Sequence, residues 1–317
     1  MAEILFACGL ALLTSHAHAQ AAYPAMPIRL IVPTPAGGPS DAAARALARG
    51  LSAGLGQEVV VDNRPGANAG IGAQAVLNAA PDGYTLLFAL ASNAGLPYLS
   101  KSAPYKSITE FSPIASVGGN TQCLVVPASV AAKTLPEFVA HAKASPKPLL
   151  RGSNNVAEDM VAGQVTGALG FQLDRVPYRG APQMLPDLLE GRIQAAVLPV
   201  GASLPHVRSG RLVMLGCSMA ERLTSVPNVP TLRESGVTAA PLITAHFLVG
   251  PPRLRADIVE QLAAAVRRAT QTADYKQEME RLLISGPVRS PAETRELMLQ
   301  AEAQYMQYAR DTGASVD

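Results

Sequence analysis

A short proline- and glycine-rich loop near the start of the chain has the residue types best suited to binding an anion. It follows an apolar run over residues 28–32, contains Gly37 and Gly38, and ends at Ser40 or Asp41, which are suitable N-caps for a helix. Adjacent glycines let the backbone approach a ligand, and the first amides and dipole of a helix attract negative charge. The loop contains no lysine, metal ligand or nucleophile, so it predicts binding of a carboxylate or another small anion rather than bond breaking.

The enzyme motifs in the sequence are incomplete. Gly50-Leu51-Ser52-Ala53-Gly54 matches the G-x-S-x-G string of hydrolases, but that serine must follow a strand, and here it lies late in a helix predicted over 41–55. No P-loop, dinucleotide fingerprint or closely spaced set of metal ligands is present. We therefore expect no enzymatic activity, cofactor or metal, with a secreted α/β hydrolase as the alternative from another class.

Composition and the first residues indicate an exported globular protein. The 317 residues are 48% hydrophobic and carry a formal net charge of +2, which predicts a sizeable core, allows two domains and favours no nucleic-acid partner. Residues 4–13 form an apolar run too short to span a bilayer, and Ala17-His18-Ala19 resembles a cleavage site, although no positive charge precedes the run. We predict a signal peptide over residues 1–19.

Two cysteines remain after the predicted cleavage. Cys123 and Cys217 both lie in apolar runs with strand character. An oxidising compartment would allow them to form a disulfide, and the alternative is two buried thiols. The sequence leaves both alternatives open.

Strands and helices alternate along most of the chain. Strands predicted over 28–32, 59–61 and 85–89, with helices over 41–55 and 70–80, form a βαβαβ pattern that predicts a parallel sheet covered by helices on both faces. The pattern is repeated between about residues 134 and 217, and the remaining chain is predicted to be mainly helical. Capping-box spacings stand at Thr134, Thr231 and Ser290.

This order predicts an α/β protein of two doubly wound lobes. Because the tail has too few strands to stand alone, we assign residues 20–120 and 246–317 to lobe 1 and residues 121–245 to lobe 2. Ligands of open α/β sheets bind at the carboxyl ends of the strands, which places the ligand in a cleft between the lobes. Closure about the two crossings would be a hinge motion.

Lobe 1 is expected to hold the ligand through its first loop and through the turn after its third strand. The predicted ligand-binding residues are Pro35, Ala36, Gly37, Gly38, Ser92 and Asn93. The alternatives are a tight turn without a ligand at 35–38 and a simple polar turn at 92–93. Asp41 and Arg45 are four residues apart on one helix face, and we expect a structural ion pair that steadies the loop.

Lobe 2 is expected to hold the far end of the ligand. Its predicted ligand-binding residues are Ser153, Asn154, Asn155, Tyr178, Arg179 and Gly180. The first three offer side-chain and helix-start donors, with simple helix capping as the alternative. Arg179 has a guanidinium that can bind a second carboxylate through two hydrogen bonds. His246, a lone histidine in an apolar run, is expected to be a core residue.

Several motifs, in order, resemble those of the Bug family, the periplasmic solute-binding proteins of tripartite tricarboxylate transporters. They are residues 27–33, 35–38, 61–67, 70–72, 81–87, 176–180, 187–191 and 226–236. The resemblance implies a type II periplasmic-binding fold, a periplasmic location, no enzymatic activity, a small carboxylate ligand and membrane permease subunits as partners. We expect a monomer.

Three segments near the expected cleft depart from the family pattern. Residues 152–157 replace a Ser-Ser-Gly-x-Gly-Ser loop, the acid usual near Val197-Leu198 is absent, and Ala245 and Phe247 stand near the usual tryptophan and glycine. The ligand therefore remains open among di- and tricarboxylates, amino acids and aromatic acids. A sensor that presents its ligand without transport is a further alternative.

Overall fold

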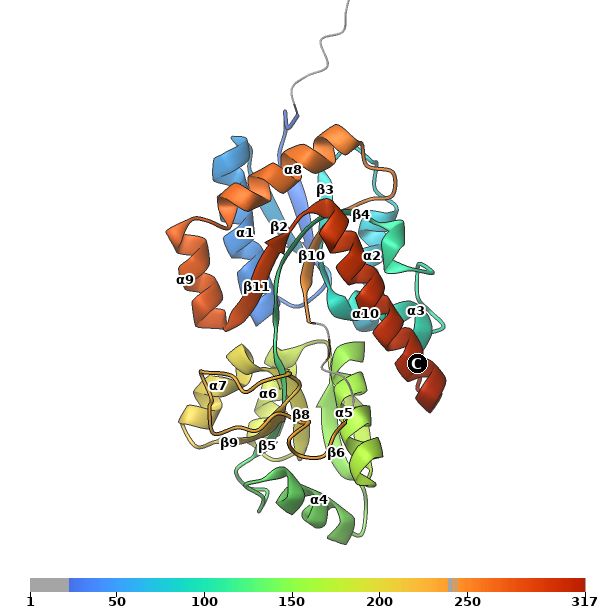
Figure 1. Ribbon diagram of the computed structural model, residues 1–317, viewed down its shortest axis with the longest axis vertical. Coiled ribbons are helices and arrows are strands. Elements are labelled where there is room, and N and C mark those ends of the chain that lie inside the picture. The colour runs from blue at the N-terminus through green and yellow to red at the C-terminus, as the bar shows by residue number, and fades with distance from the viewer. Residues whose placement is uncertain (1–22, 239–241, 243, 317) are drawn as a thin grey trace, which may run out of the picture.

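The protein is a two-lobed α/β molecule, with the lobes stacked along its long axis (Figure 1). The computed structural model describes residues 23–238, 242 and 244–316, so the predicted signal peptide lies outside the described residues. Within that part of the chain, the helices are all too short or too polar to cross a membrane. The predicted fold class is confirmed.

The upper lobe in Figure 1 is built on a mixed sheet of six strands. Their order is β11 (Ile284–Arg289), β4 (Ser112–Asn120), β10 (His246–Gly250), β3 (Thr85–Leu90), β1 (Ile28–Val32) and β2 (Val59–Asn63). Strand β1 pairs in parallel with β2 and β3, whereas β10 is antiparallel to β3 and β4, and β11 is antiparallel to β4. The expected all-parallel sheet is therefore correct for only half of this lobe.

Helices cover both faces of this sheet. One face packs against α1 (Pro39–Leu55), α8 (Ala256–Ala269) and α9 (Ala273–Leu282). The other side carries α2 (Gly70–Leu77), α3 (Leu96–Leu99) and α10 (Pro291–Thr312). Short 3₁₀ turns lie at η1 (Ala67–Ala69), η2 (Ala91–Ala94) and η3 (Ile108–Glu110). The tail packs on the first sheet as expected.

The tail is nevertheless not purely helical. Strand β11 follows α9 at the edge of the sheet, and its pairing with β4 shifts register between Ser285 and Val288. Gly286 and Pro287 interrupt the strand, and Ile284 is its buried residue. Glycine and proline are tolerated in strands mainly at sheet edges and bulges. The sequence pattern over these residues therefore does not predict a strand.

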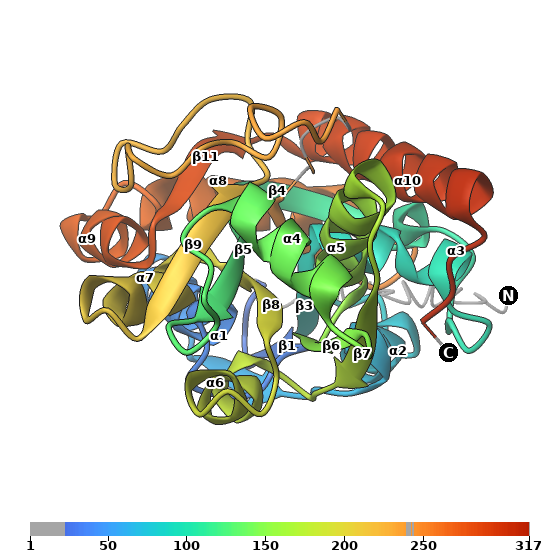
Figure 2. The same ribbon diagram turned by 90° about the horizontal axis from the view of Figure 1, so that it is seen from below.

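The lower lobe contains a second mixed sheet of five strands. Their order is β7 (Leu173–Pro177), β6 (Leu149–Ser153), β8 (Ala195–Pro199), β5 (Gln122–Pro127) and β9 (Leu212–Cys217). One face carries α4 (Leu135–Ala144) and α5 (Val156–Leu169), and the other carries α6 (Ala181–Leu189) and α7 (Val200–Arg208) (Figure 2). Alternate residues of β5 therefore enter different cores, with Leu124 on the α5 side and Val125 on the α6 side.

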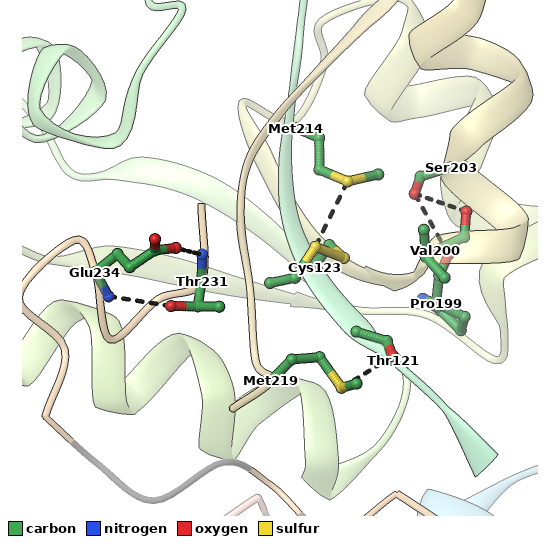
Figure 3. The surroundings of a disulfide bond; sticks show 10 residues. Thr121, Cys123, Pro199, Val200, Ser203, Met214, Met219, Thr231 and Glu234 are labelled. Atoms are coloured by element: carbon green, nitrogen blue, oxygen red, sulfur yellow. Dashed lines mark hydrogen bonds between the residues drawn. A yellow bond between two sulfur atoms is a disulfide. The ribbon is translucent and has the colours of Figure 1, made fainter. Parts of the chain in front are cut away.

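The two cysteines form a disulfide. Cys123 and Cys217 are directly paired residues of the antiparallel strands β5 and β9, and both are buried (Figure 3). The sulfur of Met214 lies 3.6 Å from the sulfur of Cys217. The bond therefore ties β9, at the edge of the second sheet, to the strand that enters this lobe from β4.

Two of the three capping boxes begin helices. Thr134 caps α4 and Ser290 caps α10. At the third, the Thr231 amide donates to the Glu234 carboxylate at 2.7 Å and the Glu234 amide donates to the Thr231 hydroxyl at 3.1 Å (Figure 3). Residues 232–236 nevertheless form only turns, since Gly236, with a φ of 89°, ends the segment. The reciprocal bonds close a turn without nucleating a helix.

Candidate functional site

A cavity of about 680 Å³, including the open space at its mouth, lies between the two lobes. It is bounded by the starts of three helices: α1 from lobe 1, and α5 and α6 from lobe 2. The residues that line it are Thr34, Pro35, Gly38, Pro39, Ser40, Leu90, Ala91, Ser92, Asn120, Gln122, Asn154, Asn155, Ala157, Glu158, Gly180, Ala181, Pro182, Pro199, Thr244, Ala245, His246 and Tyr305. A helix start presents unpaired amides and positive potential, so this cavity suits an anion.

Helix α1 presents its first turn to the cavity, although its cap differs from the expected one. The N-cap is Gly38, and Pro39 occupies the first helical position, where its missing N–H costs nothing. Neither Ser40 nor Asp41 is the cap, because the Asp41 carboxylate bends back to accept the Gly37 amide at 2.9 Å. Pro35 and Gly38 line the cavity, whereas the exposed Ala36 and Gly37 do not.

The predicted ion pair of Asp41 and Arg45 is confirmed. Arg45 Nε lies 3.0 Å from the Asp41 carboxylate, which also accepts a 2.9 Å hydrogen bond from Asn63. Burial alone would raise the pKa of Asp41, but the hydrogen bonds from Arg45, Gly37 and Asn63 outweigh it and hold the pKa below its ordinary value. This acid is therefore ionised and fully partnered within the loop.

The two predicted residues in the turn after β3, Ser92 and Asn93, have different roles. Ser92 is 3% exposed, lines the cavity and has no partner for its hydroxyl among the described residues. Asn93 is fully buried, and its side-chain oxygen accepts the Leu90 amide at 2.9 Å. Asn93 does not line the cavity and steadies the turn that carries Ser92.

The polar groups at the start of helix α5 are hydrogen-bonded mainly to one another. Asn155 is its N-cap, with its side-chain oxygen accepting from the Ala157 amide at 2.9 Å and the Glu158 amide at 3.2 Å. The Glu158 carboxylate accepts from the Asn154 amide at 2.8 Å and from the side-chain amides of Asn154 and Asn155 at 2.6 and 3.0 Å. Ser153 is fully buried at the end of β6 and does not line the cavity.

Glu158 is a cavity residue that the sequence analysis missed. It is 1% exposed, and burial, aided by the neighbouring charge of Asp159, raises its pKa to about 8. Its hydrogen bonds and Arg151 act in the opposite direction but do not offset the burial. The available signal was its position, the third residue after the Asn155 cap, where an acid commonly faces the helix start.

Gly180 brings lobe 2 close to the loop of lobe 1. An added Cβ at Gly180 would lie 2.6 Å from the Cγ of Pro35, so only a glycine permits this approach across the cleft. Tyr178 and Arg179 line an adjoining cavity that shares Thr34, Leu90, Asn154 and Asn155 with the main one. The Tyr178 hydroxyl donates to Asp187 at 2.7 Å, and the Arg179 side chain is exposed.

Six residues that line the main cavity have a buried polar atom without a partner among the described residues. They are Thr34, Ser92, Asn120, Gln122, His246 and Tyr305. Buried polar groups are normally hydrogen-bonded, so this concentration in one place marks a site for a polar ligand. All except Ser92 lie outside the predicted ligand-binding set, because they come from four separate segments that only the fold brings together.

His246 is buried as expected, 2% exposed, and its ring lies 4.9 Å from that of Phe88. Burial lowers its pKa to about 4, so the imidazole is neutral at physiological pH. The Asn120 side-chain amide donates to His246 Nε2 at 3.1 Å, which places the ring proton on Nδ1. Nδ1 is the unpartnered atom, and it is therefore a hydrogen-bond donor at the cavity.

The hydrolase-like string does not form a nucleophile elbow. Ser52 lies late in α1, where its hydroxyl donates to the Ala48 carbonyl at 2.8 Å and accepts the Val59 amide at 2.9 Å. The residue fastens α1 to β2 and does not line the cavity. No group of three or more potential metal ligands occurs in the described part of the chain.

Two lobes around a polar cleft define the class of solute-binding proteins with a periplasmic-binding fold. The chain belongs to the tripartite tricarboxylate transporter family receptors, since the profile of that family matches residues 43–308. This confirms the resemblance found in the sequence.

Individual relatives agree with this assignment. The chain is 34% identical over 276 residues to the UPF0065 protein in the gbd 5′ region of Cupriavidus necator, covering 86% of this chain and 83% of that protein. It is 31% identical to protein BugT of Bordetella pertussis, covering 93% and 91%.

Two solved structures with the same fold match this chain over nearly their whole length. The periplasmic binding protein BugD matches with a TM-score of 0.86 and 25% identity, covering 92% of this chain and 99% of that one. Rpa4515 of R. palustris, solved with adipate, matches with a TM-score of 0.85 and 26% identity and covers the same shares. The family and these neighbours are binding proteins.

Proposed function

We propose that this protein captures a small organic acid in the cleft between its lobes and delivers it to membrane permease subunits. The observation that carries the proposal is the set of six unpartnered buried polar atoms around one cavity that is bounded by three helix starts. Burying an unpaired polar atom costs about 1–3 kcal/mol, and a polar ligand would recover much of that cost. The proposal includes export to the periplasm and a monomeric state.

Hydrogen bonds rather than a cation neutralise the bound carboxylate in this proposal. Among the described residues that line the cavity, none is a lysine or an arginine. The amides of Ser40 and Asp41 in the first turn of α1 have no partner within the helix, and the ring N–H of His246 is a further donor. A carboxylate held in this way needs no counter-charge, because the helix dipole favours it. The adipate in the R. palustris neighbour supports this class of ligand.

A thermal-shift screen followed by titration calorimetry tests the proposal. Mono- and dicarboxylates of four to six carbons, amino acids and aromatic acids form the panel, with amines of the same size as controls. A ligand at 100 times its dissociation constant should stabilise the protein by about 2.7 kcal/mol. Stabilisation by amines alone, or by no member of the panel, would contradict the proposal.

A further inference from the structure

We propose that the Glu158 carboxylate occupies the place of a second ligand carboxylate, so that the cleft selects acids with one carboxylate and a neutral, hydrogen-bond-donating far end. The inference rests on the proposed function and narrows its ligand class. It sets this chain apart from its neighbour with bound adipate, because adipate has a carboxylate at both ends.

Several donors at the start of α5 are already in use. Glu158 takes the backbone amide of Asn154 and the side-chain amides of Asn154 and Asn155, at 2.6–3.0 Å. The Asn155 side-chain oxygen is turned toward the helix as its cap. A ligand carboxylate that approaches this helix start therefore finds its hydrogen-bond donors bound to a carboxylate of the protein itself.

Glu158 forms no ion pair among the described residues. Arg151, whose charge acts on Glu158, and Arg175 both bind Asp159, whose carboxylate lies 2.6 Å from Arg151 and 3.0 Å from Arg175. Two carboxylates in contact repel unless they share a proton. A second ligand carboxylate therefore binds here only together with a proton.

The remaining unpartnered groups on this cavity include two that only accept. Asn120 Oδ1 and Gln122 Oε1 are buried and have no donor among the described residues. Oε2 of Glu158 accepts a single hydrogen bond and has room for another. A primary amide or hydroxyl group at the far end of the ligand supplies the missing donors, whereas a carboxylate supplies none.

Matched ligand pairs and the isosteric variant Glu158→Gln test the inference. Succinate, glutarate and adipate are each titrated against their monoamides, which have the same length but one carboxylate fewer. At about pH 9, above the pKa of Glu158, we expect the best monoamide to bind the unmutated protein at least about tenfold more tightly than its diacid. In Glu158→Gln this preference should fall by about tenfold, whereas Glu302→Gln, a buried glutamate on α10 that binds Tyr98 and Ser107, should retain it.

A pH series on the unmutated protein gives a second measurement that does not depend on folding of a variant. The raised pKa of Glu158, about 8, means that the carboxyl loses its proton as the pH rises from about 6 to about 9. The affinity for a diacid should fall over this window relative to that for its monoamide. Of the other titratable groups near Glu158, Asp159 is held by two arginines, His246 is already neutral, and the buried Tyr305 has a strongly raised pKa.

The outcomes separate the two proposals. If diacids bind the unmutated protein as tightly as their monoamides, or if neither Glu158→Gln nor pH changes the preference, the role of Glu158 is refuted and the proposed function stands. If no acid or monoamide binds either protein, the proposed function fails and this inference fails with it.

Discussion

The starts of α1 and α5 face the same cleft from opposite lobes, and each has an acid at its third helical position. In α1, Asp41 turns away from the cleft and binds Gly37, Arg45 and Asn63. In α5, Glu158 lies at the cleft and takes the donors of the preceding loop. The start of α1 keeps its first amides free of acidic side chains, whereas the start of α5 is occupied by a carboxyl group of the protein itself.

The residue four positions further along each helix explains the difference. Arg45 stands at that position in α1 and helps to keep the pKa of Asp41 low, whereas Ala162 stands there in α5 and offers Glu158 no ion pair from its own helix. An acid near a helix start therefore does not by itself show whether that start binds a ligand. Its partners decide whether the amides remain free.

Blocking the start of α1 should have the largest effect on ligand affinity. Gly38→Val is expected to weaken binding of the best ligand at least about 100-fold, or about 2.8 kcal/mol, because the side chain enters the space at the first turn of α1. The fold should persist, since Gly38 has a φ of −86° and its added Cβ would meet only the Pro35 carbonyl oxygen at 3.9 Å. Titration calorimetry measures the affinity and circular dichroism the melting temperature.

Gly167→Val is the matched control for this variant. Gly167 lies late in α5, away from the cavity, and its added Cβ would meet nothing within 4 Å. It should bind normally. Unchanged affinity in a folded Gly38→Val protein would show that the start of α1 does not hold the ligand.

Removing the N-cap of α5 should have an intermediate effect, which is seen in the stability of the protein. Asn155→Ala loses two hydrogen bonds to the first turn of α5 and one to Glu158, and should lower the free energy of unfolding by about 1 kcal/mol. Thr134→Ala removes the comparable cap of α4, outside the cleft, and should cost a similar amount. Urea denaturation measures both.

Ligand preference, measured in the same two cap variants, tests whether the start of α5 selects the ligand. Only Asn155→Ala should alter the preference for a monoamide over its diacid, because only this cap also contacts Glu158. An equal change in Thr134→Ala would mean that the preference follows general stability rather than the start of α5.

The smallest effect is expected for the ion pair of Asp41 and Arg45 in the first turns of α1. Arg45→Ala should lower the free energy of unfolding by about 0.5 kcal/mol or less, because the Arg45 side chain is 46% exposed and Asn63 still binds Asp41. Ligand affinity should change less than about threefold, measured by calorimetry beside the stability curve. A large loss of affinity would place Arg45 in the binding site rather than behind it.

The sequence predicted well where the signal was local. The loop before α1, the Asp41–Arg45 pair and the capping boxes at Thr134 and Ser290 follow from spacing over a few residues. The sequence offered no prediction where residues that lie together in the structure are far apart along the chain. Tyr305 lies about 270 residues after Thr34, yet both line one cavity. Asn154 and Asn155 line the cavity, but nothing in their spacing showed that Glu158 uses their amides.

By itself, the amino-acid sequence determined an alternating α/β chain with a glycine- and proline-rich loop before its first helix, because glycine, proline and capping residues act on the backbone within a few positions. Only the tertiary structure decided which helix starts meet at the cleft, which buried polar atoms stay without partners, and that Cys123 and Cys217 are bonded. The physical reason is that hydrogen-bond saturation and burial depend on neighbours in space, and those neighbours come from both ends of the chain.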